Sequence, residues 1–444
     1  MAEDPADSVE AKEIREEARA FFEENWDPEI TLGEWWQRLA DSGFAVPTWP
    51  TESFGRGLSS DLAAVVDEQR RAVGAPGAPA GLGLMLAGPT IVSHANDDVK
   101  QRFLRKIVTG EHAWCQLFSE PGAGSDLASL QTRAVRDGEE WVVNGQKVWT
   151  SGAQVADMGM LIARTNPDAP KHKGITYFAL DMNQPGVDVR PLKEMTGRAM
   201  FNEVFFDDAR VSHADMIGDQ NEGWSAALTT LANERVGLGG GGTGGMGGGQ
   251  PGQKAGMLGQ KAGDFVEGGA GTRRAMGAMG GMAMAMGGGG GRGGRGQMMT
   301  MLAQAQGRAQ DPVLRQDLMK LHQMSEIGRF TSLRSKAAVA QGRRPGPEAS
   351  TGKLNVSRMT RATRETGLAI LGAHGMLKGG DAPMGGAIGE LATFSPAVSI
   401  YGGTDEIQHN IIGERVLGLP KEPDLSRDVP FKELKVGTQK KPAE

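Results

Sequence analysis

Two short segments near the middle of the chain carry side chains suited to a ligand site. The first, residues 118–126 (FSEPGAGSD), is a glycine-rich turn with a hydroxyl residue toward each end. Backbone N–H groups exposed by such a turn, together with Ser125, can hold a phosphate or the polar edge of a heteroaromatic ring. The second, residues 144–152 (NGQKVWTSG), places the flat apolar surface of Trp149 beside two hydroxyl residues. Either segment alone is a weak signal, but at this spacing the two together are specific.

The apolar periodicity divides the chain into a helical region, a strand-rich region and a second helical region. Residues 9 to about 110 carry apolar side chains at helical spacing. From residue 113 to about 215, short alternating segments follow one another without helices between them, which predicts antiparallel strands. The later strands are expected over residues 158–165, 174–181, 187–191 and 203–206. Earlier in this region, the Asn144-Gly145 pair predicts a β-hairpin turn. Helical patterns return after the strands and predict helices over residues 223–236, 298–305, 312–340, 350–371 and 404–417.

A glycine- and methionine-rich segment, residues 239–296, interrupts the second helical region. Nearly half of its residues are glycine, and each glycine costs a helix about 1 kcal/mol relative to alanine, so we expect no continuous helix. Two interpretations stay open, namely a flexible surface loop and a lid lined by methionines. The run GGGGGRGGRG has too few arginines and no aromatic residues to indicate RNA binding. We expect domains at 1–112, 113–222 and 223–444, the last interrupted by this insert.

The composition excludes several classes of protein. The chain has 444 residues, 39% of them hydrophobic, and a formal net charge of −6, so charge gives no reason to expect nucleic acid or an anionic membrane as a partner. A single cysteine, Cys115, cannot form an intramolecular disulfide, which favours a reducing compartment. The N-terminus is acidic, and no run of about 18 apolar residues predicts a membrane span. The seven histidines show no ligand spacing, so we expect a cytoplasmic protein without a metal site.

Several longer segments resemble the acyl-CoA dehydrogenase family over nearly all of the chain except the glycine-rich insert. The segments are QLFSEPGAGSDLA, VVNGQKVWTSGA, FNEVFFDDARV, the NEGW helix start and IYGGTDEIQHNIIGERVLGLP. The resemblance implies an α+β fold with an N-terminal helical domain, a middle antiparallel β-barrel-like domain and a C-terminal four-helix bundle. It also implies FAD between the last two domains, with a second subunit often completing the adenine end.

The resemblance assigns nine residues to the cofactor. Gln116, Phe118 and Ser119 are expected to line the flavin, and Gly124 and Ser125 to lie beside both the flavin and the substrate. Trp149 is expected to pack on the isoalloxazine, and Ser151 to hydrogen-bond near its N5 and O4 edge. Thr404 and Glu406 are expected to touch the cofactor from the C-terminal domain. A buried strand aromatic is the alternative interpretation of Trp149. Turn and N-cap roles explain Glu120 and Asp126 better than catalysis.

A proton α to a thioester is removed by a carboxylate, with hydrogen-bond donors on the carbonyl oxygen. Many family members carry the catalytic glutamate in a YEGT segment, but this chain has Gly402 at that position. Members resembling the long-chain and isovaleryl branches supply the carboxylate from a Glu-Arg pair on an earlier helix, which corresponds here to Glu234-Arg235. The resemblance therefore implies Glu234 as base and the Gly402 N–H as a donor to the substrate. A solvated or ion-paired helix glutamate is the alternative for Glu234.

Two departures weaken the adenine half of the expected FAD pocket. The family's Arg-x-x-Phe-Gly segment is not found, its place being taken by residues 239–296, and Ala369 replaces an expected glutamine. Either a partner subunit supplies these contacts or FAD binds by a modified route. We expect oxidation of an acyl-CoA to the trans-2-enoyl-CoA, with electrons passed to an electron-transfer flavoprotein, by a homo- or hetero-oligomer such as a dimer or tetramer. The alternative is a non-catalytic subunit that completes the FAD site of a related chain.

Overall fold

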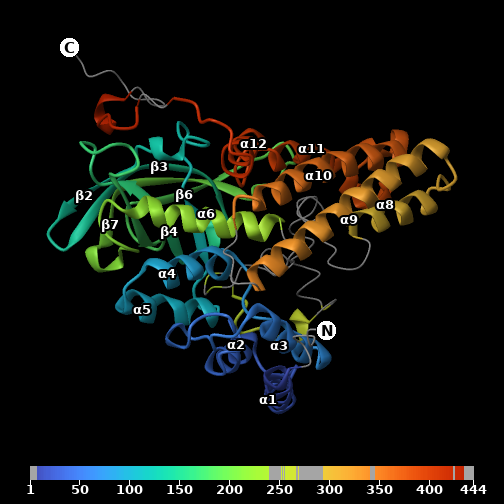
Figure 1. Ribbon diagram of the computed structural model, residues 1–444, viewed down its shortest axis with the longest axis horizontal. Helices are drawn as coiled ribbons and strands as arrows, with labels where there is room; N and C mark the ends of the chain where they lie inside the picture. The colour runs from blue at the N-terminus through green and yellow to red at the C-terminus, as the bar shows by residue number, and fades with distance from the viewer. Residues whose placement is uncertain are drawn as a thin grey trace.

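The computed structural model describes residues 8–239, 252, 254, 256–266, 269, 294–340, 346–423 and 426–434. Helices form the N-terminal part, strands the middle and helices again the C-terminal part (Figure 1). This order confirms the fold class predicted from the sequence.

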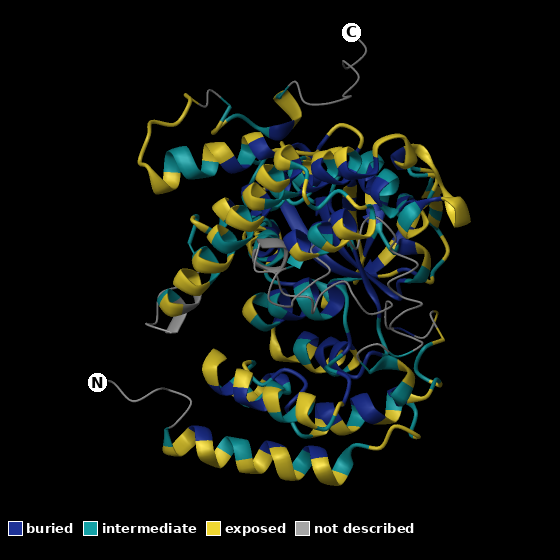
Figure 2. Cartoon of the chain, turned by 90° about the vertical axis from the view of Figure 1, so that its right-hand side faces the viewer, coloured by how far each residue is buried: buried dark blue, intermediate teal, exposed yellow. Residues whose placement is uncertain are grey.

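Five helices make up the N-terminal part, and most begin at a polar capping side chain. Ser8, Ser59 and Asn96 each accept a hydrogen bond from a backbone N–H of the first turn. Thr31 and Glu34 form a reciprocal capping box at the start of the second helix. The helices are α1 (Val9–Asn25), α2 (Leu32–Asp41), α3 (Ser60–Ala72), α4 (Gly88–His94) and α5 (Asp97–Val108). Their outer faces are exposed and their inner faces buried (Figure 2).

Seven strands form one sheet in the order β1-β4-β2-β3-β7-β6, with β5 also paired to β4. The strands are β1 (Trp114–Leu117), β2 (Arg133–Asp137), β3 (Glu140–Ser151), β4 (Met158–Arg164), β5 (Ile175–Asp181), β6 (Val187–Leu192) and β7 (Phe201–Ser212). Most neighbours are antiparallel, as predicted, but β1 and, through a single residue pair, β2 run parallel to β4. The long connection from β1 to β4 through β2 and β3 permits this parallel pairing.

The hairpin predicted at Asn144-Gly145 is wrong. Strand β3 continues through these residues, and the hairpin turn between β2 and β3 lies instead at Gly138. Asn144-Gly145 forms a bulge opposite β7, where the Asn144 amide donates to Asp208 Oδ1 (2.9 Å) and accepts from the Asp208 N–H (3.1 Å). A Cβ atom at Gly145 would lie 2.5 Å from Thr132 Oγ1. Long-range pairing with β2 and β7 therefore overrides the local turn preference.

The C-terminal helices pack along one another and against the sheet (Figure 1). They are α6 (Gly223–Gly239), α8 (Gly294–Ala305), α9 (Pro312–Ala340), α10 (Ala349–Leu371), α11 (Ala387–Val398) and α12 (Asp405–Ile411), the last continuing as a π-helical turn over Ile412–Val416. The sequence patterns did not predict α11, which contains Pro396. Among the described residues, no helix is both long and apolar enough to cross a bilayer.

Part of the expected insert packs on the N-terminal helices. The Leu32 N–H donates to Gln260 O (2.7 Å) and the Gly33 N–H to Leu258 O (2.9 Å). These carbonyl groups therefore satisfy two backbone N–H groups at the start of α2. The methionines between residues 276 and 286, and the arginine-glycine run up to residue 293, lie outside the described residues. The interpretations of the insert as a loop or a lid therefore remain predictions.

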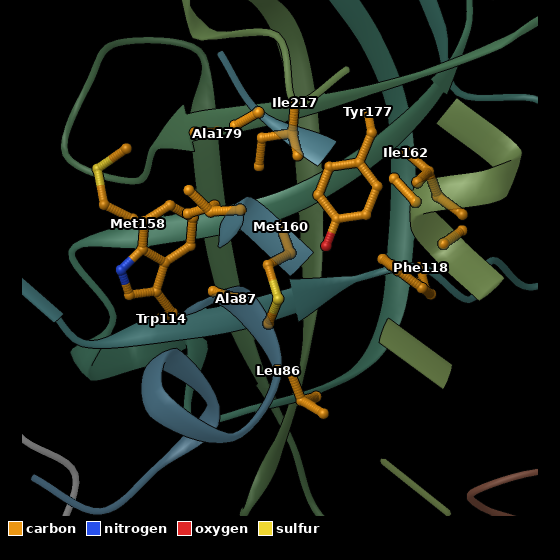
Figure 3. Packing of buried hydrophobic residues seen from close by; sticks show 14 of the residues in the cluster. Leu86, Ala87, Trp114, Phe118, Met158, Met160, Ile162, Tyr177, Ala179 and Ile217 are labelled. Carbon is orange, nitrogen blue, oxygen red and sulfur yellow. The ribbon is translucent and has the colours of Figure 1, made fainter. Parts of the chain in front are cut away.

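The largest buried cluster joins α4, α5 and α6 to β1, β4 and β5. Trp114 and Phe118 from the first strand region meet Met160 and Tyr177 from the next two strands (Figure 3). A π-helical turn over Gly83–Ala87 brings Leu86 onto this cluster. This core holds β1, which bears Gln116, at a fixed position relative to α6.

Candidate active site

A buried ion pair anchors the glycine-rich loop to β3. Lys147 Nζ contacts Glu120 Oε1 at 2.8 Å and donates to Phe118 O at 2.9 Å. The Glu120 carboxylate also accepts from the backbone N–H groups of Gln131 (2.6 Å) and Thr132 (2.9 Å). Glu120 was expected in a turn or N-cap role, and the structure adds this ion pair. Sequence reasoning missed Lys147, because nothing local distinguishes it from an exposed strand lysine.

Each member of this pair shifts the pKa of the other toward its charged form. Burial alone would raise the pKa of Glu120, but the Lys147 ammonium and the hydrogen-bond donors around the carboxylate outweigh burial and lower it. Burial lowers the pKa of Lys147, and Glu120 opposes that shift. Because both groups are buried, their charges hold the loop in one position.

Trp149 points away from the core, which contradicts the alternative of a buried strand aromatic. The register of β3 against β7 shifts between Lys147 and Thr150, and Trp149 has φ +62°. Its side chain is 62% exposed and meets the ring of Phe201 edge-on, with centroids 6.0 Å apart. An indole held out on a strand in this way offers a flat apolar face to a ligand.

The Trp149 end of the sheet meets the C-terminal bundle. Met200 and Phe201 pack against a small core on α11 that contains Phe394 and Val398, and Tyr401 packs on the same core. An ion pair between Arg198 and Glu390 lies at the same junction. The tertiary structure thus brings the loop that follows α11 close to the end of β3 that carries Trp149 and the half-buried Ser151.

Glu234 lies on α6 and contacts β1. Gln116 Nε2 is 3.5 Å from Glu234 Oε2, so the predicted base meets a predicted flavin-lining residue. Burial raises the pKa of the Glu234 carboxyl, and Gln116, Arg235 and Lys353 oppose only part of that shift. Burial likewise raises the pKa of Tyr401, and the charge of Glu234 adds to this effect. A partly buried carboxylate with a raised pKa beside a ligand-binding loop is suited to proton removal.

Gln408 holds the loop that contains Gly402. Gly402 and Gly403 have φ angles of +65° and +81°, which glycine adopts without strain. The buried Gln408 side chain donates from Nε2 to Gly402 O (2.9 Å) and Gly403 O (3.3 Å). Thr404 is the N-cap of α12 and accepts from the Ile407 N–H at 3.2 Å. Sequence reasoning missed Gln408; its spacing of one helical turn from Thr404 was the available signal.

A second buried ion pair fixes the start of α12. Asp405 contacts Lys353 Nζ at 3.1 Å and Arg361 at 2.5 Å, both from α10. Its backbone N–H donates to Ser399 O at 3.0 Å. The loop between α11 and α12 is therefore tied at both ends to the bundle.

Replacing Gln408 with methionine removes the donor that orients this loop but keeps the side-chain volume. Loss of a single oxyanion donor costs about 10²–10³-fold in kcat, and Gln408 acts through the Gly402 backbone, so we expect a loss of about 10-fold. The measurement is thioester-dependent reduction of the bound cofactor under single-turnover conditions. Gln101→Met, on the exposed face of α5, is the matched control. An unchanged rate in Gln408→Met would show that Gln408 does not orient Gly402 for the reaction.

The residues at this junction fit FAD. The buried polar atoms without a hydrogen-bond partner in the described part of the chain include some at this junction, among them Tyr401 Oη, Gln408 Oε1 and Thr150 Oγ1. A cofactor rich in hydroxyl, carbonyl and ring nitrogen groups can satisfy such atoms, and the exposed Trp149 offers a surface for its ring system.

Gly124 and Ser125 form an exposed loop tip, and Glu406 is also exposed. None of the hydrogen bonds among described residues joins these three to Glu234.

Comparison with known proteins agrees with this architecture. Three family descriptions match: "Acyl-CoA dehydrogenase, N-terminal domain" at residues 8–111, "middle domain" at 115–209 and "C-terminal domain" at 269–417. The chain belongs to the acyl-CoA dehydrogenase family. These proteins are oxidoreductases, and the resemblance predicted from the sequence is confirmed. The C-terminal match begins inside the segment 239–296, so it reaches further into that segment than the sequence motifs did.

Relatives and solved structures with the same fold cover most of the chain. The chain is 36% identical to "Acyl-CoA dehydrogenase FadE34" of Mycobacterium tuberculosis, over 86% of this chain and 46% of that protein. It is 35% identical to "Acyl-CoA dehydrogenase IpdE1" of the same organism, over 87% and 88% of the two chains. The chain thus spans about half the length of the first relative and most of the second.

Two solved structures are named after pairs of proteins. "Tcur3481-Tcur3483 steroid ACAD" matches with a TM-score of 0.66 and 26% identity, over 94% of this chain and 99% of that chain. The "ChsE4-ChsE5 complex from Mycobacterium tuberculosis" matches with a TM-score of 0.64 and 25% identity, over 94% and 100% of the two chains. Assembly from two related chains therefore occurs among proteins similar to this one.

Among the described residues, no group of three or more His, Cys, Asp or Glu side chains is placed to hold a metal ion. Cys115 is buried in β1, and burial raises the pKa of its thiol to about 12. The thiol is therefore protonated near neutral pH and is a core residue.

Proposed function

We propose that this protein catalyses the FAD-dependent α,β-dehydrogenation of an acyl-CoA thioester to the trans-2-enoyl-CoA. The observation that carries the proposal is the position of Glu234, beside Gln116 of β1 and electrostatically coupled to Tyr401 next to Gly402. Family membership supports the reaction type. Electron transfer to an electron-transfer flavoprotein and a cytoplasmic location are further parts of the proposal.

The chain's own residues have distinct roles in this reaction. Glu234 takes the proton from the α carbon, and the C–H electron pair becomes part of the new double bond. The N–H of Gly402 donates to the thioester oxygen, which lowers the cost of charge developing there. Gln116 donates to Glu234 and orients its carboxylate.

FAD is held by residues of both domains. When bound, it supplies the acceptor for the hydride that leaves the β carbon. On the sheet side, Trp149 covers the ring system and Ser119 and Ser151 lie along it, whereas the ring of Phe118 is 4% exposed and packs in the buried cluster. Gly124 and Ser125 border both the cofactor and the substrate, and Thr404 and Glu406 reach the cofactor from the start of α12.

The second candidate is a subunit that completes the FAD site of a related chain without catalysing the reaction. The paired names of two similar structures favour it. The missing Arg-x-x-Phe-Gly segment and the presence of Ala369 also weaken an FAD site formed by this chain alone. The Glu234 position argues for catalysis, because a purely supporting subunit needs no partly buried carboxylate beside Gln116.

The visible absorption spectrum of the chain purified alone tests the proposal, followed by addition of acyl-CoA thioesters of different chain lengths. We expect a stoichiometric flavin band that bleaches with at least one thioester. Colourless protein that acquires flavin only when co-expressed with a related chain would instead support the second candidate. In that case Glu234 must be tested within the complex.

A further inference from the structure

The C-terminal segment 426–434 folds back onto the sheet domain. It lies beyond residue 417, where the match to the C-terminal family domain ends, and it appears in red above the sheet, apart from the bundle (Figure 1). The Phe431 N–H donates to Ala169 O (2.9 Å) and the Lys432 N–H to Pro167 O (3.0 Å). Lys432 also pairs with Asp168 at 2.6 Å. The segment is thus attached to the connection between β4 and β5.

Phe431 closes over a buried arginine. Its side chain is 4% exposed, and its ring centroid is 3.7 Å from the guanidinium carbon of Arg164, which is also 4% exposed. Stacking of a guanidinium on an aromatic face is favourable, particularly where water is excluded. Phe431 therefore excludes water from one face of the Arg164 guanidinium.

Arg164 in turn holds the backbone beside the predicted cofactor loop. Its guanidinium donates to Ala128 O (2.6 Å) and Lys171 O (2.6 Å). Lys171 Nζ pairs with Asp126 at 2.9 Å, and Asp126 directly follows Ser125. A continuous series of contacts thus runs from Phe431 through Arg164 to the end of the glycine-rich loop.

We propose that Phe431 is a positioning residue for the cofactor loop and acts through Arg164. By covering the guanidinium, the C-terminal segment keeps Arg164 bonded to Ala128 O, within residues 126–130, and to Lys171 O, whose side chain pairs with Asp126. A loop fixed in this way presents its N–H groups and Ser125 to a ligand without an ordering cost at binding. The relevance to FAD rests on the proposed function, whereas the effect on the loop does not.

Amide hydrogen exchange of the full-length chain tests this proposal directly. In Phe431→Ala we expect exchange at residues 126–132 to accelerate about tenfold, the size of effect that a desolvated cation–π contact supports. Phe431→Tyr keeps the aromatic face and is expected to exchange like the unmodified chain. Phe330→Ala is the matched control, because Phe330 is 59% exposed on α9.

A double-mutant cycle tests whether Phe431 acts through Arg164. Arg164→Lys keeps the positive charge, but the ammonium lacks the planar set of donors with which the guanidinium bonds both carbonyls. We expect Arg164→Lys to raise the exchange rates of the same amides, and the addition of Phe431→Ala to raise them little further. Unchanged exchange at residues 126–132 in folded Phe431→Ala would overturn the proposal, and so would fully additive effects in the double variant.

The dissociation constant for FAD gives the second readout. We expect it to rise about tenfold in Phe431→Ala and to return to the original value in Phe431→Tyr. A chain that binds no FAD in any variant would contradict the proposed function, while the exchange data would still decide the role of Phe431. Tight FAD binding in Phe431→Ala would overturn the link between the C-terminal segment and the cofactor loop.

Discussion

Replacing Glu234 with glutamine is expected to lower thioester-dependent flavin reduction by at least ~10³-fold, because a positioned general base contributes about that much. The amide keeps the shape of the side chain and can still contact Gln116, so FAD should remain bound. Stopped-flow absorbance at the flavin band measures the rate, and the spectrum before mixing shows the bound cofactor. Glu326→Gln, on the surface of α9, is the control, because Glu326 pairs with its helix neighbour Arg329 far from the site residues in the chain. Near-normal turnover in Glu234→Gln would remove Glu234 from the mechanism.

The pH dependence gives an independent check on Glu234. Burial raises the pKa of this carboxyl above its ordinary value of 4.5. A base works only when deprotonated, so the rate should fall as the pH drops through the raised pKa, at a higher pH than for an exposed glutamate. A rate that stays constant down to pH 4.5 would conflict with a buried base at this position.

Replacing Lys147 with methionine is expected to destabilise the protein by about 3–5 kcal/mol, because Glu120 would be left as an uncompensated buried charge. Urea unfolding followed by circular dichroism measures the change. The double variant Lys147→Met/Glu120→Gln should recover part of the loss, since no buried charge remains. Lys320→Met, which breaks an exposed pair with Asp317 on α9, is the control and should change stability little. Equal destabilisation by Lys147→Met and Lys320→Met would show that the buried pair does not anchor the loop.

The contribution of this ion pair to folding stability depends on pH through Glu120. Its pKa in the folded protein is lowered below its ordinary value, so the folded state binds this proton less readily than the unfolded chain. The resulting stability is present above the ordinary pKa of 4.5 and is lost as the pH falls through the lowered folded pKa. The difference in stability between the unmodified chain and Lys147→Met/Glu120→Gln should therefore shrink in acid.

Most of the architecture followed from local patterns. Helical spacing before residue 110 and after residue 223, and the alternation between them, reflect the two periods with which helices and strands present one face to a core. The long helix predicted at residues 312–340 has those bounds as α9. The predicted strands after residue 158 correspond to β4, β5, β6 and β7. Periodicity succeeds here because each element buries one continuous face.

The errors arose where distant partners decide the local conformation. Asn144-Gly145 has the composition of a turn, yet two flanking strands pair along both sides of β3 and make it a bulge. The parallel pairing of β1 with β4 depends on where the chain returns to the sheet, which no local pattern encodes.

For the candidate site, the sequence by itself determined which groups are chemically capable: a glycine-rich loop, the flat indole of Trp149 and the carboxylate of Glu234, with glycine at residue 402. Only the tertiary structure decided how they are held. Lys147 and Phe431 come from segments far along the chain from the groups that they contact, Phe118 O and Arg164. The physical reason is that motif chemistry is carried by neighbouring residues, whereas burial, pKa and orientation depend on contacts that exist only after the domains have packed together.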